Sequence, residues 1–377
     1  MPTILDHAEL VGNVSLTRRP FDALDSLILT QIVYMPMEGW MDHGERCTIA
    51  QAWTGLRKHC DYETLDVFQK KRYRLTEACA GLSRYAQWIV GDYVNQIDAQ
   101  REMQFCAATF DLLNGTSHIS FRGTDLTIAG WKEDLNLSFM IVPAQLEAVR
   151  YVERAAMSGH QLMLGGHSKG GNLAVYASAT VSVDVQEQIA QVYSFDGPGL
   201  DEETLGSDGY HRVTDRIESY IPQSSVVGML LYYHPVYTVV RASALGILQH
   251  DAMTWQIEDG KFDTLDDLDM SGKITDEALH AWLGGIKMDE RKLLVDTLYD
   301  VVGAAQSELV TDLVEDWLDS ASKMLEAIRG IDPEVKRKVR KMIRSLFSTG
   351  ASEVVRMILP GIAEIGRTEK TVPADDE

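Results

Sequence analysis

Cysteine is scarce in this chain, and its few cysteines are scattered. They are Cys47, Cys60, Cys79 and Cys106, with no C-x-x-C spacing and no cluster of histidines nearby. Disulfides persist in oxidising compartments, whereas isolated cysteines are typical of reducing ones. We therefore expect free thiols and no cysteine-based metal site.

Long apolar runs are also missing. No stretch approaches the roughly 18 consecutive apolar residues that a membrane-spanning helix needs. The opening residues, MPTILDHAELVGNVSLTRRP, carry acids early and lack a continuous apolar core, a pattern that predicts no secretory signal. We expect a cytoplasmic protein without stable membrane insertion.

Basic residues are the third shortage. The chain has 35 Lys and Arg against 56 Asp and Glu, a formal net charge of −21. Such acidity keeps a protein soluble and opposes broad binding to nucleic acid or to anionic membranes. With 45% hydrophobic residues in 377, the chain is long enough for one large domain and an appendage.

The apolar pattern changes along the chain. Residues 22 to 100 read as mostly helical, including EACAGLSRYAQWIVGDYV (77–94). MQFCAATFDLL and HISFRGTD are then short strand-like runs around Asn114-Gly115, a strong hairpin signal. Helical and strand-like segments then alternate. They are the helical AQLEAVRYVERAAMSG, the strand QLMLGG, a helix from Gly171, and the strands QVYSFDG, RIESYIP and YTVVRAS. This alternation predicts a mainly parallel sheet covered by helices on both faces.

From Thr275 the strand signals stop, and the remaining periodicity is helical. Asp332-Pro333 is a good helix start, because the aspartate can cap free N–H groups and proline suits the first helical position. We predict an α/β domain over 1–270 that includes the N-terminal helical extension, a helical C-terminal region over 271–367, and a disordered tail over 368–377.

The segment Gly166-His167-Ser168-Lys169-Gly170 fits G-x-S-x-G between a strand and a helix. In that context the motif predicts a nucleophile elbow, a strained turn that exposes the serine hydroxyl. Flanking glycines let strand and helix approach closely. The N–H groups that follow lie at a helix N-terminus, where partial positive charge favours an oxyanion. The alternative is a glycine-rich corner with an incidental serine.

Several ordered blocks resemble the class 3 (fungal-type) lipases, and more closely a bacterial family of lipase-like α/β-hydrolases with no assigned activity. The blocks are FRGT at Phe121–Thr124, WKEDL from Trp131, GHSKGG from Gly166, SFDGPGL, IPQSSVVGML and QHDAMTW. The resemblance as a whole covers roughly residues 22 to 260. The resemblance implies an α/β-hydrolase fold, with Trp131 and Asp134 in a block that anchors the region after the oxyanion loop.

Residue by residue, the resemblance assigns Ser168 as nucleophile. The turn at Gly123 aims Thr124 at the site as oxyanion residue, and the backbone N–H of Lys169 is its partner. The lipases usually carry an apolar residue where Lys169 stands. Residues 126–140 mix apolar and charged side chains and suggest a short lid over the pocket.

His250 matches the lipase histidine in order and context, and its polar loop suits a general base that must reach a serine hydroxyl. His234 is the rival, and a non-catalytic role for both histidines is the remaining alternative. His167 is adjacent to the serine and cannot easily fold back on it.

The triad acid departs from the lipase pattern. Where the lipases have an aspartate, this chain has Ser224 and Ser225. Asp196, at the end of the strand after the nucleophile helix, gives the hydrolase order Ser, Asp, His. The alternatives are that Asp196 only caps a turn, or that Asp215 or Asp251 is the acid.

Together these residues predict a serine esterase or lipase-like enzyme that acts on a small-molecule acyl ester through an acyl-enzyme. Such chemistry needs no metal or organic cofactor. The loop DLDMSGKITDEA resembles a calcium loop but has Ala278 in place of the bidentate glutamate. A thioesterase or acyltransferase, or a non-catalytic scaffold that binds a ligand or partner, remains an alternative, since the fold alone does not fix the chemistry.

Overall fold

The computed structural model describes residues 1–39, 41, 44–98, 100–101, 103–124, 137, 141–225, 227–229, 236–270, 272–273, 285, 287, 290, 293, 297 and 329–348. The chain forms two compact units. The first comprises Met1–Asp125 and Ala129–Asp269, and the second Leu126–Ile128 and Met270–Glu377.

The first unit contains a nine-stranded sheet among its described residues, in the order β1-β2-β3-β4-β5-β6-β7-β8-β11. The strands are β1 (Arg46–Thr48), β2 (Ile89–Asp98), β3 (Met103–Asp111), β4 (Thr116–Phe121), β5 (Gln161–His167), β6 (Ile189–Phe195), β7 (Ile217–Pro222), β8 (Thr238–Val240) and β11 (Thr264–Leu265). Strands β4 to β8 run parallel to one another, which confirms the predicted parallel sheet. At one end of the sheet, each neighbouring pair from β1 to β4 is antiparallel. At the other end, β11 pairs antiparallel with β8. A small hairpin, β9 (Ile257–Glu258) with β10 (Lys261–Phe262), lies outside it.

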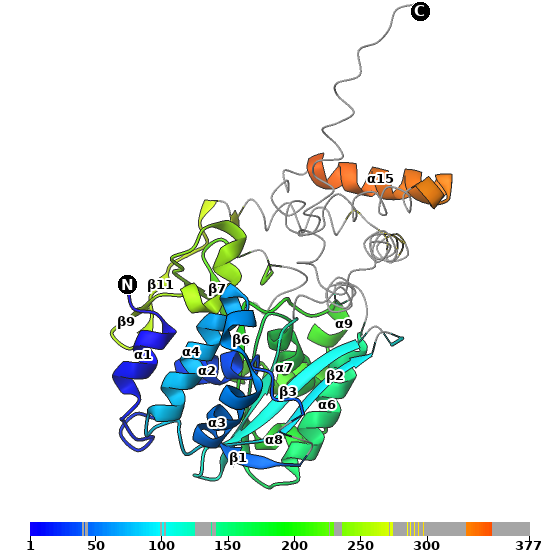
Figure 1. The fold of residues 1–377 in the computed structure, drawn as a ribbon. Helices are drawn as coiled ribbons and strands as arrows, with labels where there is room; N and C mark the ends of the chain where they lie inside the picture. Colours follow the sequence, from blue (N-terminus) through cyan, green and yellow to red (C-terminus); the bar gives the residue numbers. More distant parts are fainter. Residues whose placement is uncertain are drawn as a thin grey trace, which may run out of the picture. The chain divides into compact units, whose positions relative to one another are not determined.

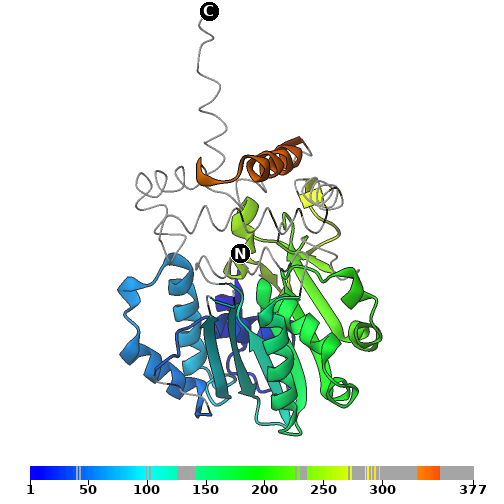
Figure 2. The ribbon, with the colours of Figure 1, turned by 90° about the vertical axis from the view of Figure 1, so that its right-hand side faces the viewer.

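Helices cover both faces of this sheet (Figures 1 and 2). One layer consists of α1 (Ile4–Val11), α2 (Ala23–Ile32), α3 (Ile49–His59) and α4 (Val67–Gly81). The other consists of α6 (Pro143–Ala156), α7 (Lys169–Thr180), α8 (Val183–Gln188) and α10 (Asp208–Val213), with the short α9 (Glu202–Leu205). Short 3₁₀ turns complete the unit at Tyr62–Thr64, Thr214–Arg216, Gly246–His250 and Ala252–Thr254.

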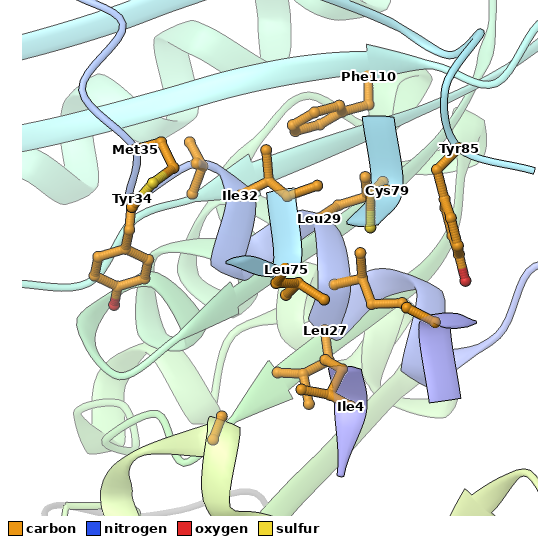
Figure 3. Packing of buried hydrophobic residues seen from close by; sticks show 14 of the residues in the cluster. Ile4, Leu27, Leu29, Ile32, Tyr34, Met35, Leu75, Cys79, Tyr85 and Phe110 are labelled. Carbon is orange, nitrogen blue, oxygen red and sulfur yellow. The ribbon is translucent and has the colours of Figure 1, made fainter. Parts of the chain in front are cut away.

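The alternation of side chains along β3 shows why two layers form. Cys106, Ala108 and Phe110 belong to the core under the N-terminal helices, while Phe105 and Ala107 belong to the core under α6 and α7. Successive strand residues point to opposite faces, so a strand with apolar residues on both faces must be covered twice. Figure 3 shows the first of these cores, with Phe110 packed against side chains of α2 and α4.

The hairpin predicted at Asn114-Gly115 is confirmed: β3 and β4 pair antiparallel, and Gly115 has a φ of 83°. The helix predicted over 77–94 is wrong beyond Gly81, where α4 ends and β2 follows from Ile89. Residues 89–94 include Ile89, Val90, Tyr93 and Val94, which favour a strand once β3 is there to pair with. Tertiary pairing here overrides an apolar spacing that also fits a helix.

In the second unit, α15 (Pro333–Ser348) begins where Asp332-Pro333 predicts it. The Asp332 Oδ1 accepts hydrogen bonds from the N–H groups of Glu334 and Val335, at 2.8 and 3.2 Å. Most of the predicted helical region 271–367, the tail 368–377 and the suggested lid 126–140 lie outside the described residues. The predicted domain limits stay a prediction. No helix among the described residues combines the length and apolarity needed to cross a bilayer.

Candidate active site

Ser168 lies at the turn between β5 and α7, in a backbone conformation that few non-glycine residues adopt. Its φ is 60° and its ψ is −132°, a strained geometry that persists only where the surroundings enforce it. The Ser168 N–H donates to the carbonyl of Phe195 at 2.9 Å, and the Gly171 N–H donates to the Ser168 carbonyl at 2.9 Å. The turn therefore fixes Ser168 at the carboxyl ends of β5 and β6.

The flanking glycines permit this turn because no side chain fits there. A Cβ on Gly166 would lie 2.0 Å from the carbonyl of Gly170, and one on Gly170 would lie 2.1 Å from the carbonyl oxygen of Phe121. Such distances exclude any larger residue without backbone movement. The glycine spacing in the motif is thus a requirement of close strand–helix packing.

His250 and Asp196 are brought together at the same edge of the sheet. The His250 Nδ1 is 2.6 Å from the Asp196 Oδ2. Asp196 is 1% exposed, whereas the His250 side chain is 25% exposed. A carboxylate facing Nδ1 favours the tautomer with its hydrogen on that nitrogen, which leaves Nε2 as the basic atom.

Asp196 is held in place by its own backbone and by the loop after β7. Its φ is 49°, and its N–H donates to the carbonyl of Tyr220 at 2.8 Å. The Oδ1 accepts from the Ser225 hydroxyl at 2.5 Å and from the Gly228 N–H at 3.1 Å. One carboxylate oxygen is thus anchored, and the other faces His250. Ser225 is one of the two adjacent serines, with Ser224, at which the resemblance to the lipases predicts the acid.

The rival acids make other contacts. Asp251 forms an ion pair with Lys71, at 2.6 Å between its Oδ2 and the Lys71 Nζ, and its Oδ1 accepts from the Met253 N–H. Asp215 lies in the 3₁₀ turn before β7, at the opposite end of that strand from Asp196. Of these acids, Asp196 is the one that contacts His250. The rival base His234 lies outside the described residues, as do Trp131 and Asp134.

The segment that carries Thr124 approaches Ser168 directly. A Cβ on Gly123 would lie 2.6 Å from the His167 carbonyl oxygen and 2.9 Å from the Ser168 Cβ. Thr124 follows at once and is partly exposed. The backbone N–H of Lys169 lies in the first turn of α7. Both predicted oxyanion donors therefore belong to segments that flank Ser168.

Two contacts of this site have no sequence signal, and both involve His167. The His250 carbonyl can only accept, so the His167 Nε2, 2.7 Å away, carries a hydrogen. The His167 Nδ1 then accepts from the Tyr34 hydroxyl at 3.2 Å, and that hydroxyl accepts from the Gly123 N–H at 3.0 Å. This chain of bonds links the oxyanion segment to the loop of His250.

His167 stays neutral in this arrangement. Burial, and then the neighbouring His250 and Arg72, lower the pKa of His167 well below its usual value of 6.5. The Arg72 guanidinium lies 3.9 Å from the centre of the Tyr34 ring. With the ring neutral and its hydrogen on Nε2, the Nδ1 keeps a lone pair and can accept from the Tyr34 hydroxyl. Tyr34 follows α2, so the N-terminal helices contribute to the site.

A serine at a strained elbow, a histidine–aspartate pair and a mainly parallel sheet between helical layers define a lipase-like α/β-hydrolase fold. The chain belongs to the Mbeg1-like family, whose sequence model matches residues 80–300.

Among solved structures, M37 lipase is similar with a TM-score of 0.36 and 12% identity, covering 55% of this chain and 70% of that one. The Rhizomucor miehei lipase in complex with its propeptide is similar with a TM-score of 0.30 and 16% identity, covering 48% of this chain and 63% of that one. No curated protein matches the chain.

Proposed function

We propose that the protein is a serine hydrolase that cleaves carboxylic esters through Ser168, His250 and Asp196. The observation that carries this proposal is the 2.6 Å contact between the His250 Nδ1 and the Asp196 Oδ2, next to the elbow of Ser168. Membership of the Mbeg1-like family, with its lipase-like fold, supports ester hydrolysis as the class of reaction.

Each residue has a role in the proposed mechanism. The His250 Nε2 removes the hydroxyl proton as the Ser168 Oγ attacks the acyl carbon, and the Asp196 carboxylate stabilises the imidazolium that forms. The backbone N–H of Lys169 and the hydroxyl and N–H of Thr124 hold the oxyanion. His250 returns its proton to the departing alcohol, and a water molecule then hydrolyses the acyl-enzyme by the same route.

In this proposal Asp196 is the triad acid, a role that the lipase pattern assigns to an aspartate after the strand that follows β6. Its support comes from the loop after β7, where Ser225 and Gly228 both donate to the Oδ1. If Asp196 only capped a turn, its Oδ2 would need no contact with His250.

The test is hydrolysis of p-nitrophenyl esters of increasing acyl length by the full chain, compared with Ser168→Ala. We expect turnover by the wild-type protein that falls to background in the variant. Thioesters assayed alongside distinguish an esterase from a thioesterase. If no ester or thioester is hydrolysed above the Ser168→Ala background, the proposed function is wrong and a binding scaffold takes its place.

A further inference from the structure

Lys169 is the least expected residue of the elbow. It occupies the first position of α7, and its side chain is 1% exposed, among the largest fully buried side chains described. A helix N-terminus carries partial positive charge and disfavours a cation. Burial of an ammonium group adds a desolvation cost. Stability alone therefore favours an apolar residue at this position.

The Lys169 side chain reaches a strand rather than solvent. Its Nζ donates to the carbonyl oxygen of Gln104, at 3.0 Å, and Gln104 is 2% exposed. Gln104 is the second residue of β3. Lys169 thus connects the start of α7 to the beginning of β3.

That point of β3 is next to the predicted oxyanion segment. In the β3–β4 register Ala107 faces Phe121, and the Arg122 N–H donates to the Cys106 carbonyl at 2.9 Å. Gln104 lies two residues before Cys106 in β3, and Thr124 lies two residues after Arg122, beyond the end of β4 at Phe121. Lys169 therefore holds the strand that binds the segment carrying Thr124.

We propose that the Lys169 ammonium is a positioning residue for the oxyanion site, an inference that rests on the proposed function. The backbone N–H of Lys169 is one oxyanion donor, and its side chain holds β3, which binds Arg122, two residues before the other donor, Thr124. One residue thereby sets the separation of the two donors.

The variant Lys169→Met keeps the length and packing of the side chain and removes its charge and its hydrogen-bond donors. With p-nitrophenyl acetate we expect kcat to fall about 100-fold, as for a misplaced or lost oxyanion donor. KM should stay within about threefold, because the loss lies in the transition state. The melting temperature should equal or exceed that of the wild type, since a buried charge is removed.

Arg216→Met is the matched control. Its guanidinium donates to the carbonyl groups of Gln186 and Ile189, near the start of β7 and away from Ser168. This variant also removes a cation that binds carbonyl groups, but we expect lower stability and a kcat within about threefold of wild type.

A double-mutant cycle with Thr124→Ala tests whether Lys169 acts through Thr124. We expect Lys169→Met to change kcat by less than about threefold in the Thr124→Ala background, because coupled residues are not additive. Full additivity overturns the proposal, as does wild-type kcat in Lys169→Met. A variant that fails to fold or melts earlier also overturns it, because the lysine then serves stability.

Comparison of Lys169→Met with the wild type and with Ser168→Ala separates the inference about Lys169 from the proposed function. If the wild type hydrolyses the ester, Ser168→Ala does not, and Lys169→Met matches the wild type, the inference about Lys169 fails alone. If the wild type shows no Ser168-dependent turnover, the proposed function fails and this inference fails with it.

Discussion

At the scale of single residues, the site depends on the Asp196 carboxylate, whose two oxygens have different partners. The Asp196 Oδ1 is bound by Ser225 and Gly228, and its Oδ2 faces His250. A Cβ on Gly228 would lie 2.6 Å from the Asp196 Oδ1, so only glycine allows this approach. The acid therefore stands at the end of β6 and uses the loop after β7 as its support.

Asp196→Asn tests this arrangement. The amide can donate to the His250 Nδ1, which would place the ring hydrogen on Nε2 and remove the basic atom that the proposed mechanism requires. We expect kcat for p-nitrophenyl esters to fall by about 10³-fold or more, with the fold retained. Asp251→Asn is the control, because it removes the ion pair with Lys71 and leaves the Asp196–His250 contact intact. A larger loss in Asp251→Asn than in Asp196→Asn would transfer the acid role to Asp251.

The sequence predicts some of these residues and not others. The position of Ser168 in a strained turn is predictable, because the turn requires glycines next to the serine and the motif contains them. The order of Ser168, Asp196 and His250 also follows from the chain. The contacts of Tyr34 and Ser225 are not predictable, because they join loops distant in sequence and depend on hydroxyl groups that any surface serine or tyrosine carries.

At the scale of elements, β5, the elbow and α7 form one unit that tolerates no added Cβ. We expect Gly166→Ala to lose more than about 3 kcal/mol of unfolding free energy or to prevent folding, since the new Cβ would lie 2.0 Å from the Gly170 backbone. The measurement is urea unfolding followed by circular dichroism.

Gly81→Ala is the matched control for that prediction. Gly81 ends α4, and a Cβ there would meet no atom within 4 Å. We expect it to stabilise the protein by about 0.5–1 kcal/mol, because alanine restricts the unfolded chain. Equal effects of the two substitutions would contradict the packing described for the elbow.

The strand β2 shows where prediction from periodicity fails at this scale. Its apolar residues are spaced as a helix needs, and the chain becomes a strand because β1 and β3 pair with its two edges. Asp92 has a φ of 52° and the register shifts between Gly91 and Val94. A bulge of this kind disturbs the simple alternation that identifies a strand. Strands β4 to β7 lack such a bulge in their central residues and are predicted well.

At the scale of the whole molecule, a buried histidine couples folding to pH. His7 of α1 is 1% exposed, and neither ring nitrogen has a hydrogen-bond partner among the described residues. Burial, with a further contribution from Arg19, lowers the pKa of His7 from 6.5 to about 4. Between these values the unfolded chain binds the proton and the folded chain does not. Stability therefore falls as the pH drops from 6.5 towards 4.

His7→Phe should remove this dependence. Below pH 6.5, we expect the free energy of unfolding to fall less steeply in the variant than in the wild type. The difference between the two slopes should be up to about 1.4 kcal/mol per pH unit. At pH 7 the variant should be at least as stable as wild type, because two buried polar atoms are lost. Urea unfolding at pH 4.5, 5.5 and 7 measures both effects. An unchanged slope would mean that His7 is not protonated on unfolding.

The central claim is that Ser168 is an activated nucleophile. The most direct measurement is mass spectrometry of the protein after reaction with a fluorophosphonate probe, with the labelled residue located by peptide sequencing. We predict one adduct, on Ser168, that forms more slowly by orders of magnitude in His250→Ala and not at all in Ser168→Ala. An unlabelled Ser168, or an adduct that forms equally fast without His250, would contradict the account.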